Sequence, residues 1–142
     1  MSKARDIDIV TKTLWMEARG EPEEGIQAVA CVIYNRYKSN KWYSRRWGVR
    51  SLANVCLKNA QFSCWNAGDQ CDTKLKSADT NSEVWHICEK YARMASEGTL
   101  DDIVDGADHY YAISLRKKPA WAKKMKVICQ IGNHRFYKDE NI

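Results

Sequence analysis

The first third of the chain carries two runs of apolar residues at helical spacing, separated by a short break. In each run an apolar side chain recurs every three or four positions, as in a helix with one buried face. The first run predicts a helix over residues 5–18, and the second predicts a helix over residues 22–38. Gly20 lies in the break between them, and Pro22 suits the first turn of the second helix.

A carboxylate interrupts the buried face of the first predicted helix. Glu17 follows Leu14 on the apolar stripe, at the end of the helix and just before the break. Burying a carboxylate is costly unless it is neutralised, paired or put to use. Position alone leaves two interpretations open: a structural ion pair with Arg19 or Arg36, or a catalytic acid facing a cleft.

The middle of the chain predicts one more long helix. Thr80-x-x-Glu83 has the pattern of a capping box, and Gly98 is a natural C-terminal stop, so we expect a helix between them. A short helix is expected over residues 51–57, followed by an irregular region rich in Gly, Asn and Asp.

The C-terminal third predicts a small amount of β structure. Residues 109–114 and 126–138 are rich in β-branched and aromatic side chains, which favours two short strands or one small hairpin. A short helix is expected over 119–125 between them. The predicted fold class is therefore mainly α, with a small β element near the C-terminus. We expect residues 1–142 to form a single domain.

Composition restricts the class of protein. A chain of 142 residues with 44% hydrophobic and 29% charged residues is typical of a soluble globular domain with one core. No apolar run approaches the ~20 residues of a membrane span. The first ten residues lack the apolar core of a signal peptide. We therefore expect synthesis in a cytoplasm, no membrane span and a monomer.

The cysteines and histidines do not indicate a metal site. No cysteine pair has C-x-x-C spacing, and the three histidines are isolated from the six cysteines, so we expect no metal and no cofactor. Free thiols are expected in the absence of a leader that would direct export. A disulfide stays open only within the loop-rich stretch that holds Cys56, Cys64 and Cys71.

A basic and aromatic segment occupies residues 41–50, KWYSRRWGVR. It contributes four basic side chains to a chain whose formal net charge is +5. Such a mixture can grip single-stranded nucleic acid or an anionic glycan or cell envelope, or it can be a solvated loop with aromatic side chains packed on the core. The 18 acidic residues and the lack of a recognition motif disfavour nucleic acid. We therefore expect an anionic cell envelope as the partner, and no nucleic acid.

Most catalytic signatures do not occur in this chain. It has no G-x-S-x-G nucleophile motif, no phosphate-binding loop and no dinucleotide fingerprint. What remains is an acid at a helix end together with aromatic and amide side chains, a composition typical of grooves in which a carboxylic acid protonates a glycosidic oxygen. The candidates are Glu17, Gln61, Phe62, Ser63, His109, Tyr110, Tyr111 and the segment G-N-H-R-F-Y at 132–137. Of these, the single histidines His109 and His134 suit either a supporting role beside the substrate or a purely structural one.

Four segments, in order, resemble the SleB-type cell wall hydrolase family of spore-cortex-lytic enzymes and their relatives. They are E-A-R-G-E-P at 17–22, A-V-A-x-V-I-x-N-R at 28–36, Q-F-S at 61–63, and G-A-x-H-Y at 106–110 with I-G-N-H-x-F-Y at 131–137. The resemblance covers about residues 8–138. The ordered set is much more specific than any one of its members.

The resemblance implies a lysozyme-like catalytic domain that cleaves peptidoglycan between N-acetylmuramic acid and N-acetylglucosamine. It implies a lytic transglycosylase, with Glu17 as the catalytic acid and base. The side chains implied to bind the substrate are Gln61, Ser63 and Tyr110 on the acetamido groups, Phe62 as an apolar wall, and His109 and Tyr111 beside them.

Other activities stay open at this point. A hydrolytic muramidase would need a second carboxylate roughly 5–9.5 Å from the first. Glu21, Glu24 and Asp69 are candidates, although Glu21 and Glu24 also suit the positive end of a helix dipole. A non-catalytic wall-binding module and a basic nucleic-acid-binding protein are the alternatives from other classes.

The sequence departs from the family in two ways. Spore enzymes of the family carry an export signal and often a peptidoglycan-binding module, and neither is apparent in this sequence. In addition, residues 41–72 have an unusual, insertion-like density of Trp, Arg and Cys. Small basic lytic proteins without a leader resemble phage endolysins, which reach the wall through a holin-made hole. We therefore expect a phage endolysin that is made in the host cytoplasm and acts on the cell wall.

Overall fold

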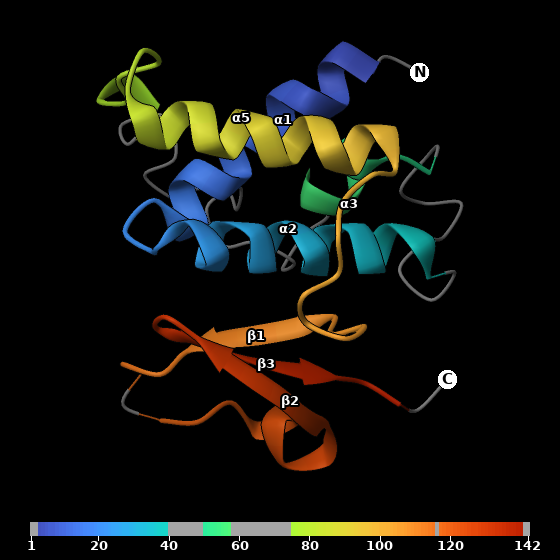
Figure 1. Cartoon of the computed structure of the whole chain (residues 1–142). Coiled ribbons are helices and arrows are strands. Elements are labelled where there is room, and N and C mark those ends of the chain that lie inside the picture. Colours follow the sequence, from blue (N-terminus) through green and yellow to red (C-terminus); the bar gives the residue numbers. More distant parts are fainter. Residues whose placement is uncertain (1–2, 40–49, 58–74, 116, 141–142) are drawn as a thin grey trace.

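A computed structural model describes residues 3–39, 50–57, 75–115 and 117–140 (Figure 1). Its helices are α1 (Lys3–Ala18), α2 (Glu23–Lys38), α3 (Leu52–Leu57), α5 (Glu83–Glu97) and the 3-10 helix η4 (Ala120–Lys124). Its strands are β1 (His109–Ala112), β2 (Lys126–Ile131) and β3 (His134–Lys138). The predicted fold class, mainly α with a small β element near the C-terminus, is confirmed.

Helix α2 lies in the middle of the molecule, between the α1–α5 pair and the sheet (Figure 1). The apolar stripes that predicted α1 and α2 are core faces, because Leu14, Ile26 and Ile33 are completely buried. Helix α2 also holds the segment that leads from α5 into β1. Asn35 Nδ2 donates to the Ala107 carbonyl at 2.9 Å, which fixes the point where the sheet begins.

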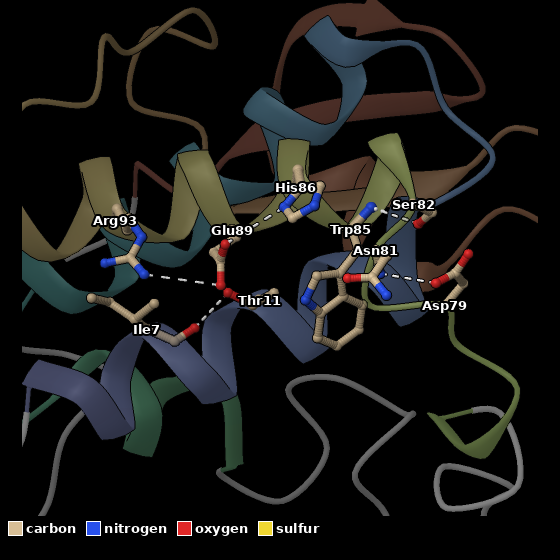
Figure 2. A network of polar contacts seen from close by, with 9 residues as sticks. All are labelled: Ile7, Thr11, Asp79, Asn81, Ser82, Trp85, His86, Glu89 and Arg93. Atoms are coloured by element: carbon tan, nitrogen blue, oxygen red, sulfur yellow. Dashed lines mark hydrogen bonds and ion pairs between the residues drawn. The ribbon is translucent and has the colours of Figure 1, made fainter.

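The start of α5 differs from the prediction. The N-cap is Ser82, whose Oγ accepts a hydrogen bond from the Trp85 backbone N–H at 3.2 Å, so the predicted cap at Thr80 is wrong (Figure 2). The Asp79 carboxylate accepts from the Asn81 N–H at 2.9 Å and holds the preceding residues in a turn. Thr80 and Ser82 both have side chains that can cap a helix, and the sequence pattern did not indicate which of them does so. The predicted stop at Gly98 is confirmed by its left-handed φ of 73°.

The β element is an antiparallel sheet with strand order β1-β3-β2. The single strand predicted over residues 126–138 is wrong, because the chain reverses at Gly132 and Asn133 and forms two strands. Gly132 has φ of 58°, a conformation that glycine adopts without a steric penalty. The Gly-Asn pair is a hairpin-turn signal that the dense β-forming composition of the segment concealed.

The two faces of the sheet meet different surroundings. Tyr110 pairs with Phe136, and both side chains point toward the helices. Because side chains alternate along a strand, His109 and its partner Tyr137 point to the opposite face. Trp121 of η4 covers that outer face, with ring centroids 4.9 Å from His109 and 5.4 Å from Tyr137.

The four cysteines in the described ranges are free thiols. Burial raises the pKa of Cys31 to about 11 and the pKa of Cys56 and Cys88 to about 12. Cys56 therefore does not join a disulfide, and Cys64 and Cys71 lie outside the described residues. None of the helices in the described ranges has both the length and the apolar character needed to cross a membrane.

Candidate active site

Glu17 lies in the last turn of α1, where the helices face the inner side of the sheet. Its side chain is half-buried, and its Oε1 accepts a hydrogen bond from the Tyr110 hydroxyl at 2.6 Å. Tyr110 stands on β1, 93 residues further along the chain. The fold thus brings together two of the segments that carried the family resemblance.

The arginines proposed as ion-pair partners of Glu17 have other main contacts. The Arg19 guanidinium lies over the Trp15 ring, 4.4 Å from its centroid. Arg36 is buried, and its Nε donates to the Asp108 carbonyl at 2.7 Å. Burial lowers the pKa of Arg36, while the nearby Tyr110, Asp108 and Glu17 act in the opposite direction. Arg36 is therefore a buried cation in the electrostatic surroundings of Glu17, and not the simple partner that the ion-pair interpretation required.

Glu21 connects the α1–α2 junction to the turn between β2 and β3. Its Oε1 accepts from the Asn133 backbone N–H at 2.7 Å, and its Oε2 accepts from Asn133 Nδ2 at 3.1 Å. Only 6% of the Glu21 side chain is exposed, so these bonds satisfy a nearly buried carboxylate. The turn lies very close to the Glu21 side chain, because a Cβ added at Gly132 would be 2.5 Å from Glu21 Oε1.

His134 completes the inner face of the sheet beside Tyr110. The two rings meet edge to face with centroids 4.8 Å apart. His134 Nδ1 lies 3.4 Å from Glu21 Oε1 and has no hydrogen-bond partner among the described residues. Burial lowers the pKa of His134, and the charges of Glu21 and Glu17 oppose this effect in part. The imidazole is therefore neutral at neutral pH.

This lowered pKa predicts a pH dependence of stability. Below the unfolded-state pKa of about 6.5, the unfolded chain binds a proton at His134 that the folded protein does not, so folding stability falls as the pH decreases through that range. The free energy of unfolding, measured by urea titration between about pH 7.5 and 5, should show this slope, and His134→Gln should flatten it. The matched control is His86→Gln, since His86 is exposed on α5. Equal slopes in the native protein and the His134→Gln variant would contradict the prediction.

The predicted substrate-binding residues fall into three groups. Tyr110 contacts Glu17 directly. His109 and Tyr111 project from the outer face of the sheet, where His109 Nδ1 lies 2.9 Å from Asp108 Oδ1 and Tyr111 stacks on Tyr137 at 5.7 Å. Gln61, Phe62 and Ser63 lie outside the described residues, as does most of the basic and aromatic segment 41–50.

The arrangement suits proton transfer by one carboxyl group. Among the described residues, Tyr110 alone donates a hydrogen bond to the Glu17 carboxyl group, and it binds Oε1. The other oxygen, Oε2, is therefore available to a ligand. In the same ranges, no three His, Cys, Asp or Glu side chains gather in a way that could hold a metal ion.

The sequence singled out residues 132–137 and offered Glu21 as a second carboxylate, but it did not predict that Glu21 binds Asn133 or that His134 packs against Tyr110. All three lie within the segments E-A-R-G-E-P and I-G-N-H-x-F-Y that carried the resemblance. The signal was therefore present, but nothing in one sequence indicated that these two segments bind each other.

Comparisons with known proteins show the family and the fold of the chain. Residues 20–137 match the model of a family described as cell wall hydrolase. The structure resembles the catalytic domain of the Bacillus cereus SleB protein, with a TM-score of 0.70 and 24% identity over 95% of this chain and 91% of that one. It also resembles the catalytic domain of the germination-specific lytic transglycosylase SleB from Bacillus anthracis, with a TM-score of 0.67 and 25% identity over 94% of each chain. No curated protein matches the chain significantly.

Proposed function

The chain belongs to the cell wall hydrolase family, and on this premise we propose that it cleaves the glycan strands of bacterial peptidoglycan as a lytic transglycosylase with Glu17 as its acid and base. The bond cleaved joins N-acetylmuramic acid to N-acetylglucosamine. The observation that carries the proposal is the hydrogen bond between the half-buried Glu17 and Tyr110, at the junction of helices and sheet.

The proposed reaction uses one carboxyl group twice. Glu17 first donates its proton to the glycosidic oxygen, which leaves with the N-acetylglucosamine side of the strand. Glu17, now a carboxylate, then accepts the proton of the muramic C6 hydroxyl, whose oxygen bonds to C1 and closes an anhydro ring. The proton balance is complete after both steps, so no water is consumed.

Neighbouring residues support each state of Glu17. The Tyr110 hydroxyl fixes the orientation of the carboxyl group by binding Oε1, which leaves Oε2 to face the sugar. When proton donation produces a carboxylate, the same hydroxyl and the buried Arg36 cation stabilise its negative charge.

The hydrolytic alternative has less support. Such a mechanism needs a second carboxylate that is free to activate water. Both oxygens of Glu21 are engaged by Asn133, and Glu24 is exposed at the start of α2. Asp69, the third candidate, lies outside the described residues.

Removing the Tyr110 hydroxyl should slow turnover without unfolding the protein. Tyr110→Phe keeps the ring contacts with His134 and Phe136 but removes the donor to Glu17. A hydrogen bond to a charged group contributes about 1.5–3 kcal/mol, so kcat should fall about tenfold or more with little change in KM. Steady-state kinetics and thermal melting measure the two effects. A variant with native kcat would show that the hydroxyl does not position Glu17.

Mass analysis of the sugar products tests the proposed reaction. Purified peptidoglycan should yield fragments that end in anhydro-muramic acid, each one water lighter than the corresponding hydrolysis product. Reducing muramic ends would indicate a muramidase instead. Binding to walls with no release of fragments would favour the non-catalytic wall-binding alternative.

We also propose that the activity serves lysis of a bacterial host from within, as a phage endolysin does. This chain is basic and is proposed to cleave peptidoglycan, and it resembles phage endolysins in both respects, which supports this role. Expression in a bacterial cytoplasm should lyse the cells only when a holin is produced with the protein. Lysis that is equally fast with and without the holin would contradict the proposed route to the wall.

A further inference from the structure

The C-terminal third of the chain concentrates positive charge far more than the rest. Residues 114–138 contain eight lysine and arginine side chains and no aspartate or glutamate. The remaining residues carry 15 basic and 18 acidic side chains, so the positive net charge of the protein originates in this segment. A segment of one charge sign is an electrostatic footprint that favours an anionic partner.

The fold gathers part of this charge around a hollow on the outer face of the sheet. The hollow has a volume of about 460 Å³, and its charged lining consists of Lys118, Lys123 and Arg135. Apolar and aromatic side chains form the remainder of the lining: Ala122, Met125, Val127 and Tyr137. None of the described residues that line it carries a carboxylate. We call this surface the basic outer face.

The groove between α1 and α5 provides a contrast. It is larger, about 590 Å³, but both charge signs line it, including Asp8 and Glu89 beside Lys3 and Arg93. Figure 2 shows Glu89 engaged with Arg93 and His86 on α5. Acidic and basic side chains thus neutralise each other around that groove, whereas the charged side chains that line the basic outer face in the described ranges are all positive.

The cations of the basic outer face are available to a ligand. Across the described ranges, Lys118 and Lys123 form no salt bridge, and both are exposed. Arg135 donates to Gln130 Oε1 at 3.2 Å, a neutral partner. The pKa of the half-buried Tyr111 is lowered, first by the hydrogen bond from Tyr137 and then by the nearby Arg135 and Lys118. Positive potential therefore extends across this face.

We propose that the basic outer face binds an anionic cell-wall polymer, made of polyol or sugar units joined by phosphodiesters. Lysine ammonium groups bind phosphate oxygens as point charges, and the guanidinium of Arg135 can bind a phosphate through two parallel hydrogen bonds. Exposed apolar side chains such as Val127, which is 56% exposed, can contact the carbon chain between successive phosphates. The protein would meet such a polymer where it acts on a cell wall, so this inference rests on the proposed function.

The aromatic side chains favour this polymer over a nucleic acid. Single-stranded nucleic acids bind by stacking bases on open aromatic faces. Here Trp121 meets Tyr137 at 87° and Tyr111 at 77°, so the three rings pack on one another.

Because Tyr110 and Glu17 lie on the other side of the sheet, a bound polymer would leave the catalytic carboxyl accessible.

Sedimentation with purified cell walls tests the proposal. The protein carries Glu17→Gln so that walls stay intact, and three versions are compared: no further change, Lys118→Glu with Lys123→Glu, and the matched control Lys3→Glu with Lys76→Glu. The walls are used either with their phosphodiester-linked polymer or after its removal by hydrofluoric acid, at low and high salt. A DNA duplex is the second probe. Glutamine replacements at Lys118 and Lys123 serve as a milder pair, and thermal melting verifies that each variant is folded.

Polymer-bearing walls should bind the Lys118/Lys123 variant about tenfold or more weakly at low salt, and the difference should shrink at high salt because the contacts are ionic. The control pair should change affinity by less than about threefold, since it alters net charge equally but elsewhere. Equal binding to stripped and intact walls would overturn the proposal. So would an equal loss in the control pair, native affinity in both Lys118/Lys123 variants, or tighter binding to DNA than to walls. Sedimentation requires no turnover, so these outcomes are independent of whether the protein cleaves glycan.

Discussion

Glu17→Gln is expected to lower the rate of glycan release by at least ~10²-fold, within the range of general acid–base groups. Glutamine has nearly the same shape as glutamate, and its side-chain oxygen can still accept the hydrogen bond from Tyr110. It cannot donate the proton that the leaving oxygen needs. The melting temperature should therefore change little while activity is lost.

The matched control is Glu24→Gln. Glu24 lies on the other side of the break between the helices, in the first turn of α2, where it is exposed. Release of soluble fragments from purified peptidoglycan, measured for both variants, separates a specific loss from a general one. Native activity in Glu17→Gln would exclude Glu17 as the proton donor, and collapse of the fold in that variant would support the structural ion-pair interpretation.

Gly132→Ala should destabilise the protein by about 2–3 kcal/mol, which is large for the addition of one methyl group. Residue 132 has φ of 58°, a conformation that costs an L-residue free energy. The new Cβ would also lie 2.5 Å from Glu21 Oε1 and 3.2 Å from Pro22 Cδ. To relieve this overlap, the turn must move away from the α1–α2 junction, which would weaken the bonds between Glu21 and Asn133.

Gly20→Ala is the control for that substitution. It adds the same methyl group three positions after Glu17, but nothing lies within 4 Å of the added atom and the backbone is not left-handed. Urea unfolding of both variants measures the difference. A Gly132→Ala variant as stable as Gly20→Ala would show that the turn is not held against Glu21.

The break between α1 and α2 explains how two nearby carboxylates acquire different roles. In a continuous helix, residues four positions apart lie on one face. Helix α1 ends at Ala18, so Glu17 points to Tyr110 on β1 while Glu21 points to Asn133 in the β2–β3 turn. One carboxylate remains available for chemistry, and the other fixes the sheet to the helices.

The sequence predicted the parts of the fold that depend on local periodicity. The buried stripes of α1 and α2 were visible because core residues recur at helical spacing, and Glu17 was conspicuous because it interrupts one of them. The small β element was visible from composition. The cap at Ser82 was missed because Thr80 has a side chain of similar capping propensity, and the reversal at Gly132 was missed because the surrounding β-forming residues concealed the turn.

The parts of the site that depend on strand pairing could not be predicted. His109, Tyr110 and Tyr111 are consecutive, and the sequence suggested a common role. Pairing with β3 places Tyr110 on the inner face and the other two on the outer face. Likewise, no local signal indicates that Glu21 binds Asn133, because 112 residues separate them.

Digestion of peptidoglycan in water enriched in heavy oxygen tests the central claim most directly. If Glu17 acts alone and the muramic C6 hydroxyl attacks C1, no solvent oxygen enters the new end. The released fragments should then carry anhydro ends, one water lighter than hydrolysis products and without heavy oxygen. Fragments with heavy oxygen at C1 of the muramic acid would show that water is the nucleophile and would contradict the single-carboxyl mechanism.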